Sequence, residues 1–573
     1  MATVTDGRNG LMATVTDGRV MPDIYGYGQL FAFSGLDGQT SFRDDFVGTL
    51  TAKPIGIRFE LSKPVTLFFD TQIKKCNAVT SSLIDIETET GRLSVVFSSR
   101  HTVTGLSPVE PKLITGYKTA TKGNETVCYC GLAKLVLRCT KTDDGYAFIL
   151  AYGRTLKAAY NGILSVSEYS LSGLIAGHSE FYNKHGIGSD VYARLYLKCL
   201  SVLKANIYSP EGRIPCRFTT PDRVPHKKMW LWDSAFHALA IKEFDSALAE
   251  EAVEAVLYRR KRSGMIPHMM SPYKRSRITQ PPILAYAVWE IYRKTGNRAF
   301  LERNAAKLAG YLLWDLKYRD SNGNGLPEWK TERKKNCRCG ESGMDNSPRF
   351  DNRDTMDAID FSCFFASDCE ALSKIFAELG DRENALLWQK KAEQTAQKIN
   401  ELLWDEGDDI YYDLHLNGKH GKIATCASFL PLFCGIADDN RAKKLVENLT
   451  DPAKFASPVP IPSLSMADSN FSSDLWRGGV WINYNYMIIH GLKRYGYNEL
   501  AEEIRAKTLS TVNKWYEEGG CLYEFYDPFD KERPDKLIRK GVKQPEPDWR
   551  KHMHAICDFG WTAALTLLLI LNK

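Results

Sequence analysis

The sequence predicts an α+β protein of several domains, in which an N-terminal β-sandwich is followed by a larger domain of paired α-helices arranged as a toroid. Two observations lead to this prediction. Apolar residues recur with the short period of strands up to about residue 153, and with the 3.6-residue period of helices beyond it. The loops between the predicted helices are rich in Gly, Pro and aromatic residues, and a toroid of paired helices would gather such loops at one end.

Length and composition are those of a large globular protein. The chain has 573 residues, of which 44% are hydrophobic and 25% are charged. A chain of this length exceeds one ordinary core, so we expect one large domain and an accessory one. The 75 basic and 69 acidic residues give a formal net charge of +6, which is too small over so large a surface to indicate a nucleic-acid partner.

The first residues contain the string MATVTDGR twice, at 1–8 and at 12–19. We interpret residues 1–19 as a duplicated start or a cloning remnant and leave them out of the fold. No secretion signal opens the chain, and no apolar run reaches the ~18 residues of a membrane span. We therefore expect a cytoplasmic protein that does not associate with membranes.

Fourteen cysteines are spread irregularly along the chain. Irregular spacing without a secretion signal predicts reduced thiols and no disulfide framework. Cys128 and Cys130, and also Cys337 and Cys339, form C-x-C pairs, but no further Cys or His pairs follow at the spacing of a zinc site. We predict no metal site from these residues.

Residues 20–153 are predicted to form the β-sandwich. The strings PVTLFFD (64–70) and RLSVVFSS (92–99) are rich in β-branched and aromatic residues, as strands are. Two further strands, AKLVLRCT and YAFILAYG, are separated by KTDDG, and Asp144-Gly145 within it is typical of a hairpin turn.

Residues 154–189 have a helical composition and are predicted to link the sandwich to a helical domain at 190–573. Within that domain apolar residues repeat at helical spacing, for example at Ala385, Trp388 and Ala392. The number of such stretches approaches about twelve, with examples near 190–206, 234–258, 282–294, 300–316, 360–379, 385–403, 421–434, 481–495, 500–515 and 560–572.

Four clusters in the helical region mix aromatic residues with carboxylates or amides. Aromatic faces pack on the C–H face of a sugar ring, while Asp, Asn and Arg side chains bind its hydroxyl groups, so the mixture predicts a sugar pocket. Core packing of Trp230, an N-cap role for Asp233 and a surface turn at Arg477 are the alternatives. The clusters are MWLWDSAFH (229–237), LPEWK (326–330), DLWRGGVWINYNY (474–486) and CLYEFYDPFD (521–530).

Asp345 and Glu524 are the best candidates for a catalytic carboxyl pair. Asp345 lies in ESGMDNSPRFD (341–351), whose Gly, Ser, Asn and Pro residues predict a loop, with a helix-capping role for Asp345 as the alternative. Glu524 lies between aromatic residues in a second turn-rich segment. Hydrolysis of a glycosidic bond with inversion requires one carboxylic acid and one carboxylate ~6.5–9.5 Å apart. Aromatic burial would raise the pKa of the carboxyl that must stay protonated.

A series of short strings from Pro221 to the C-terminus resembles the trehalase-like α-glycosidases of glycoside hydrolase family 63. The group includes processing α-glucosidases and the mannosylglycerate and glucosylglycerate hydrolases. The resemblance implies an (α/α)6 barrel, a toroid of six helical hairpins, with Asp345 as general acid and Glu524 as general base. In order, the strings are PHKKMWLWDSAFHA, GMIPHM, TQPPILA, GNGLPEW, ESGMDNSPRFD, WRGGVWINYNY, YEFYDP and DFGWTAA.

The resemblance also implies contacts with the sugars at subsites −1 or +1, from Trp232, Asp233, Gln280, Trp476, Arg477 and Gly478. Aromatic residues of the clusters and of DFGWTAA complete the candidate substrate-binding set with Trp230, Trp329, Trp481, Tyr523 and Trp561. The Q-W-D-Y-P signature of trehalases proper is absent, which argues against trehalose as the substrate. Mannosylglycerate hydrolases that consist of a barrel alone lack a leading sandwich, whereas the longer α-glucosidases have one.

We therefore predict an inverting O-glycoside hydrolase that requires no cofactor, an α-glucosidase acting on a small α-glucoside or oligosaccharide. One alternative is an inverting disaccharide phosphorylase, which would need only one carboxyl group. Another is a sugar-binding protein without catalysis. The sugar, the aglycone and the choice between a monomer and a homo-oligomer are not predicted.

Asp320, Asn322 and Asn324 form a D-x-N-x-N string like the start of a calcium loop. Thr331 stands where an EF-hand would have Glu, which excludes an EF-hand. Some family 63 enzymes are thought to bind calcium at a similar string. A structural calcium ion and a plain Asn-Gly turn are both open for this loop.

Overall fold

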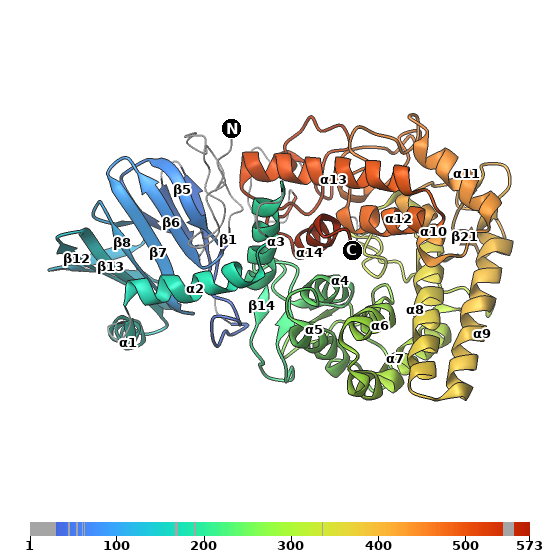
Figure 1. The fold of residues 1–573 in the computed structure, drawn as a ribbon, viewed down its shortest axis with the longest axis horizontal. Coiled ribbons are helices and arrows are strands. Elements are labelled where there is room, and N and C mark those ends of the chain that lie inside the picture. Colours follow the sequence, from blue (N-terminus) through green and yellow to red (C-terminus); the bar gives the residue numbers. More distant parts are fainter. Residues whose placement is uncertain are drawn as a thin grey trace. The chain divides into compact units, whose positions relative to one another are not determined.

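The computed structural model describes residues 30–43, 46–52, 55–59, 61, 63–166, 170–187, 191–334, 336–541 and 555–573. The repeat at 1–19 lies outside these residues. The chain divides into two compact units, one of Met1–Ser209 with Asn513–Leu522 and one of Pro210–Val512 with Tyr523–Lys573 (Figure 1). The domain boundaries proposed at 153 and 189 stay predictions.

Antiparallel strands make up most of the first unit. They are β1 (Leu30–Phe31), β2 (Gly48–Ala52), β3 (Ile55–Phe59), β4 (Val65–Phe68), β5 (Ile73–Val79), β6 (Leu83–Thr88), β7 (Gly91–Ser99), β8 (Thr102–Ser107), β9 (Lys112–Thr115), β10 (Lys118–Lys122), β11 (Glu125–Cys130), β12 (Ala133–Thr142) and β13 (Gly145–Gly153). One sheet has the order β1-β2-β3-β4-β9, and the other has the order β10-β11-β12-β13-β8-β7-β6-β5.

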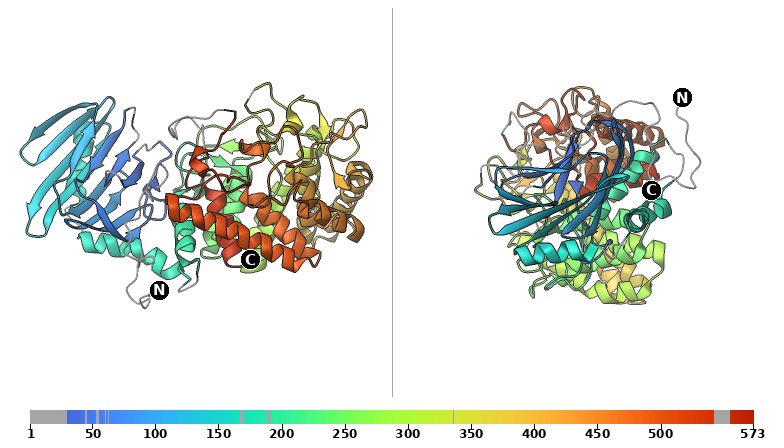
Figure 2. Two further views of the ribbon diagram at one scale, coloured as in Figure 1. Left: turned by 90° about the horizontal axis from the view of Figure 1, so that it is seen from above. Right: turned by 90° about the vertical axis from the view of Figure 1, so that its left-hand side faces the viewer.

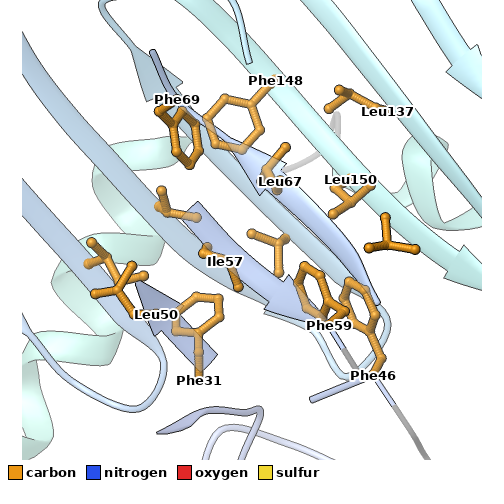
Figure 3. Close-up of a cluster of buried hydrophobic side chains, with 14 of the residues drawn as sticks. Phe31, Phe46, Leu50, Ile57, Phe59, Leu67, Phe69, Leu137, Phe148 and Leu150 are labelled. Carbon is orange, nitrogen blue, oxygen red and sulfur yellow. The ribbon is translucent and has the colours of Figure 1, made fainter. Parts of the chain in front are cut away.

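The two sheets pack face to face around one apolar core, and the left view of Figure 2 shows them as two layers. In β4, Val65 and Leu67 are fully buried while the residues after them are partly exposed. This period of two is expected of a strand with one covered face. Figure 3 shows side chains from both sheets meeting in the core, among them Leu67 and Phe148.

β12 and β13 form the predicted hairpin. Thr142 pairs with Gly145, so Asp143 and Asp144 form the turn, one position earlier than predicted. The segment predicted to be helical after the strands contains α1 (Leu156–Ser165) and α2 (Leu171–His185), and α3 (Ala193–Ala205) and β14 (Ile207–Tyr208) follow.

The second unit is mostly helical. The segment predicted at 234–258 is two helices, because the side chain of Asp245 accepts the N–H of Leu248 and starts a new helix. The helices are α4 (Leu231–Ile241), α5 (Ser246–Tyr258), α6 (Leu284–Thr295), α7 (Arg298–Arg319), α8 (Ile359–Glu378), α9 (Arg382–Lys398), α10 (Leu430–Cys434), α11 (Asp439–Thr450), α12 (Ile482–Arg494), α13 (Asn498–Gly519, which ends in the first unit) and α14 (Gly560–Ile570).

Six of these helices contact one another in a closed series. Contacts run from α4 to α6, α8, α10, α12 and α14, and α14 returns to contact α4. α5, α7 and α9 pack against α4, α6 and α8 in turn. The left view of Figure 2 shows that loops of this unit gather on one side.

Short elements lie in the loops of the second unit. They include the 3-10 turns Pro348–Phe350, Leu475–Arg477 and Pro534–Lys536. The short strands are β15 (Phe218–Thr219), β16 (Met229–Trp230), β17 (Met269–Met270), β18 (Met356–Asp357), β19 (Trp404–Asp405), β20 (Ile410–Tyr411) and β21 (Leu414–His415).

Two predictions that concern the whole chain can be compared with the structure. All fourteen cysteines fall within the described residues and none of them forms a disulfide, as predicted. Of the helices that the structure describes, none combines the length and the apolar character needed to cross a lipid bilayer.

Candidate active site

Asp345 lies on a loop between α7 and α8, as its sequence predicts. The loop is anchored by Glu341, whose buried carboxylate accepts hydrogen bonds of 2.8 and 2.5 Å from Arg319. The same carboxylate accepts the backbone N–H groups of Thr279 and Lys330. Because so many donors converge on one carboxylate, the start of the loop is held in a single place.

Gly343 brings this loop against Trp232. Its φ of 74° lies in the left-handed region, and a Cβ atom at this position would lie 2.3 Å from Cζ2 of Trp232. Glycine fits here because, without a Cβ atom, it adopts a positive φ easily and leaves room for the Trp232 ring. On the other side of Asp345, the side chain of Asn346 accepts the N–H of Trp476 at 3.0 Å. The loop is therefore fixed between two of the predicted aromatic clusters.

Glu524 lies on a separate segment between α13 and α14. Its N–H donates to the carbonyl of Ile556 at 2.8 Å, and Tyr526 exchanges backbone hydrogen bonds with Val480. The side chain of Glu524 is buried, with 6% of its surface exposed. Backbone pairing on both sides therefore fixes this buried carboxylate in place.

Two consecutive cationic residues bind the two candidate carboxylates. Arg539 donates from Nε and Nη2 to both oxygens of Glu524, at 2.7 and 2.8 Å. Nζ of Lys540 donates to Oδ2 of Asp345 at 2.6 Å. Because the side chains of adjacent residues reach both carboxylates, Asp345 and Glu524 lie near one short segment.

These cations control the charge of both carboxyl groups. Burial favours the protonated form of Asp345, but the charge and hydrogen bond of the Lys540 ammonium, together with the charge of Arg539, lower the pKa of Asp345 below its ordinary value. Burial also favours the protonated form of Glu524, but the charge and hydrogen bonds of the Arg539 guanidinium, together with the charges of His226 and Lys540, lower the pKa of Glu524 below its ordinary value. The prediction that aromatic burial raises the pKa of the acid is therefore wrong for the protein without substrate, because it did not include the cations.

Four of the predicted tryptophans form one continuous cluster. The rings of Trp232 and Trp561 meet edge to face with their centroids 5.3 Å apart, and Trp561 meets Trp481 at 5.6 Å. Trp481 stacks on Trp476, with the ring centroids 3.7 Å apart. The indole N–H of Trp561 is buried and has no hydrogen-bond partner among the described residues. The cluster thus contains a fully buried donor that is not used by the described residues.

Trp230 and Asp233 lie at the start of α4, and Gln280 contacts the backbone there. Trp230 is the N-cap residue and Asp233 lies within the first turn, so the N-cap alternative for Asp233 is wrong. Burial raises the pKa of Asp233 well above its ordinary value, and the negative charge of Glu524 adds to this effect. The side chain of Gln280 accepts the N–H of Trp232 at 3.4 Å.

Trp329 and Gly478 have partners that hold the loops in place. The indole N–H of Trp329 donates to Asp360 at 2.8 Å, and its ring stacks on that of Phe361 at 3.8 Å. A Cβ atom on Gly478 would lie 2.3 Å from the carbonyl oxygen of Ser472. These contacts indicate structural roles for both residues.

Arg477 and Tyr523 also lie within the second unit. The guanidinium of Arg477 donates to both oxygens of Asp351, at 2.5 and 2.6 Å. The alternative of a surface turn at Arg477 did not include this ion pair. Tyr523 is buried, and its carbonyl accepts the hydroxyl of Thr562 at 2.8 Å. Arg477 therefore has a carboxylate partner before any sugar arrives.

The loop with the D-x-N-x-N string closes on itself through hydrogen bonds. The amides of Asn322 and Asn324 donate to the two oxygens of Asp357, at 3.0 and 2.6 Å, and Asp320 accepts the N–H of Gly325. Among the described residues, no group of three or more His, Cys, Asp or Glu side chains is arranged to hold a metal ion. The calcium ion at this loop stays a prediction.

The sequence did not identify Arg539 and Lys540 as functional residues. The string RKG at 539–541 has no motif around it, and its partners are far away in the chain. The available signal was its position between YEFYDP and DFGWTAA, two strings already assigned to the site. Two adjacent cations there could have been matched to two carboxylates that need counter-ions.

Comparison with known proteins decides the family. Residues 225–562 match the model of the mannosylglycerate hydrolase MGH1-like glycoside hydrolase domain, which is more than half of the chain. The chain belongs to this family. It is a glycoside hydrolase, and it carries the features of the trehalase-like group of family 63. The matched range contains Asp345, Glu524 and both cations.

The mannosylglycerate hydrolase of Rubrobacter radiotolerans is 25% identical over 448 residues, which are 61% of this chain and 92% of that protein. A crystal structure of the family 63 mannosylglycerate hydrolase from Thermus thermophilus in complex with Tris has a TM-score of 0.55 and 23% identity, over 66% of this chain and 100% of that chain. A bacterial glucoamylase complexed with acarbose has a TM-score of 0.56 and 11% identity, over 100% of this chain and 96% of that chain. The structural likenesses support the fold.

Proposed function

We propose that this chain is an inverting α-glycoside hydrolase acting on a small α-glucoside or oligosaccharide, with Asp345 as general acid and Glu524 as general base. The observation that carries the proposal is the meeting of these two carboxylates at one cationic segment, Arg539-Lys540, beside the tryptophan cluster. The closed series of helices from α4 to α14 supports an (α/α)6 barrel as its scaffold.

In this mechanism Glu524 accepts a proton from water while the water oxygen bonds to the anomeric carbon. The bond from that carbon to the aglycone oxygen breaks, and Asp345 gives its proton to the departing oxygen. Arg539 keeps Glu524 ionised for its role as base. Buried Asp233 and the unused indole N–H of Trp561 are available to bind hydroxyl groups of the sugar.

A specific observation favours a second candidate, an α-glycoside whose aglycone is a small carboxylic acid. The relative from Rubrobacter radiotolerans is named for mannosylglycerate, which carries such an acid. In this chain Lys540 provides a partly exposed ammonium next to the acid Asp345, where the aglycone must depart. A cation at that point would attract a carboxylate on the aglycone.

The two-carboxylate arrangement favours hydrolysis over phosphorolysis, which would need one carboxyl group only. It also argues against a role in sugar binding without catalysis. Cysteines that are not joined in disulfides are typical of a reducing compartment, and we propose that the enzyme acts in the cytoplasm.

A hydrolysis screen tests the proposal. Wild type should hydrolyse some members of a panel of α-linked disaccharides, α-glucosylglycerate and α-mannosylglycerate without phosphate. Glu524→Gln should lose this activity, whereas Glu370→Gln, on the exposed face of α8, should keep it. Turnover that depends on phosphate would favour the phosphorylase, and the absence of turnover across the panel would contradict the proposal.

A further inference from the structure

In the protein without substrate, the contact between Lys540 and Asp345 opposes the protonation that Asp345 needs as a general acid. A general acid must hold a proton when the substrate is bound. An ammonium at 2.6 Å instead stabilises the carboxylate and contributes to lowering the pKa of Asp345. The enzyme must therefore remove Lys540 from Asp345, or offset its charge, before the acid can work.

The pair is built so that this change can occur. The side chains of Lys540 and Asp345 are 26% and 24% exposed, so water can deliver a proton and a ligand can approach the ammonium. The neighbouring pair, Arg539 with Glu524, is only 3% and 6% exposed and has two hydrogen bonds. Among the described residues, one cation is thus fixed on the base by two hydrogen bonds, while the side chain of the other has one hydrogen bond, to Asp345.

The backbone of this segment is held independently of the two side chains. Lys540 and Gly541 both have left-handed backbone, with φ of 59° and 77°. The N–H of Gly541 donates to Oδ2 of Asp474 at 2.7 Å. Because Asp474 holds the turn, the lysine side chain can leave Asp345 without displacing Arg539.

Other charged and titratable groups near Asp345 come from the elements around it. They are Arg539 on the same turn as Lys540, Lys334 and Cys337 in the same connection between α7 and α8 as Asp345, and His268 next to β17. Lys334 already pairs with Glu332 at the surface, and 70% of its side chain is exposed. Lys540 is the cation in hydrogen-bond contact with Asp345.

We propose that Lys540 is a positioning residue that couples recognition of an acidic aglycone to protonation of Asp345. Without substrate, Lys540 binds Asp345 and keeps it as a carboxylate. The carboxylate of an incoming aglycone takes over the ammonium, and Asp345 then takes one proton from solvent. Asp345 gives that proton to the departing oxygen, and Glu524 later returns to solvent the proton it took from water. This inference rests on the proposed function.

Lys540→Met is the variant that tests the proposal, with α-glucosylglycerate and α-glucosylglycerol, or the mannosyl pair, as matched acidic and neutral substrates. The variant should lose about 10- to 100-fold in kcat/KM on the acidic substrate, because a hydrogen bond between charged groups is lost. On the neutral substrate, the pH-independent maximum of kcat/KM should change little.

A pH profile separates this role from a merely structural one. The alkaline limb of kcat/KM reports the acid of the free enzyme. Removing the ammonium should raise the pKa of Asp345, so in Lys540→Met the alkaline limb on the neutral substrate should move up by ~1–3 pH units. Lys334→Met, which removes the more distant and exposed lysine, should leave both the limb and the substrate preference unchanged.

A second variant covers the case in which Lys540→Met does not fold. Asp474→Asn weakens the hydrogen bond that holds the backbone of Gly541 but keeps Lys540. In this variant the alkaline limb of kcat/KM should also move to higher pH, by a smaller amount than in Lys540→Met. The inference is overturned if folded Lys540→Met keeps the wild-type preference and limb, or if Asp474→Asn leaves the limb in place. Failure of the proposed function is different, since wild type would then hydrolyse none of the substrates or Asp345→Asn would remain active.

Discussion

Arg539→Met removes one partner of the buried ion pair at the candidate base. Both hydrogen bonds of the pair are short, and the side chains of Arg539 and Glu524 are 3% and 6% exposed. Removing one partner of such a pair leaves an uncompensated buried charge and costs ~3–5 kcal/mol. The variant should therefore lose about that much free energy of unfolding at pH 7.

The pH dependence gives the sign of this effect. In wild type the folded pKa of Glu524 lies below its ordinary value, so its contribution to stability is present above that ordinary value and is lost as the pH falls. Without Arg539 the folded pKa rises, and ionised Glu524 then destabilises the variant at neutral pH. The stability difference between the two proteins should narrow as the pH falls, and the acidic limb of kcat/KM should move to higher pH.

Urea unfolding at pH 5 and pH 8, together with pH profiles of kcat/KM, would measure both effects. Arg293→Met is the matched control, because Arg293 forms a pair with Glu290 on α6 and 62% of its side chain is exposed. That control should lose under ~1 kcal/mol. A loss below about 1 kcal/mol for Arg539→Met, with an unmoved acidic limb, would refute the account of the base.

The remaining predictions concern the acid, the loop and a buried carboxyl group. Asp345→Asn should lower kcat by ~10²–10⁴-fold on an unactivated glycoside and by less on a substrate with a good leaving group. A kcat near that of wild type on the unactivated glycoside would contradict the role of Asp345 as acid. Gly343→Ala should lose ~2–5 kcal/mol of unfolding free energy and most of its activity, because of backbone strain and the clash with Trp232. The control Gly380→Ala, whose new Cβ atom would meet no atom within 4 Å, should lose stability but keep its activity. Burial raises the pKa of Asp368 to about 7, so its ionisation destabilises the fold as the pH rises from 3.8 to about 7. Asp368→Asn should then gain stability relative to wild type over that interval in urea melts, and a constant difference would contradict the reasoning.

Local patterns predicted the parts of the site that depend on local structure. The turn residues around Asp345 predicted its loop, and glycine at 343 is explained by a positive φ and a close ring. The boundary at Asp245 could also have been found, because Asp followed by Ser is a common helix start. These features are determined by residues close together in the chain.

The charge state of the carboxyl groups could not be predicted in this way. Lys540 is 195 positions from Asp345, and neither residue indicates the other in the sequence. Aromatic neighbours suggested a raised pKa, but a contact formed only by the folded chain reversed its direction. Electrostatics depends on distances between remote segments, which periodicity and spacing do not contain.

The stereochemistry of the first turnover tests the central claim most directly. If Glu524 activates a water molecule while Asp345 protonates the departing oxygen, an α-glycoside must release a β-sugar first. Proton NMR during early turnover, before the sugar mutarotates, would show this β-anomer, and Glu524→Gln would show no product. Initial release of the α-anomer, or a glycosyl adduct trapped on Glu524, would contradict the account.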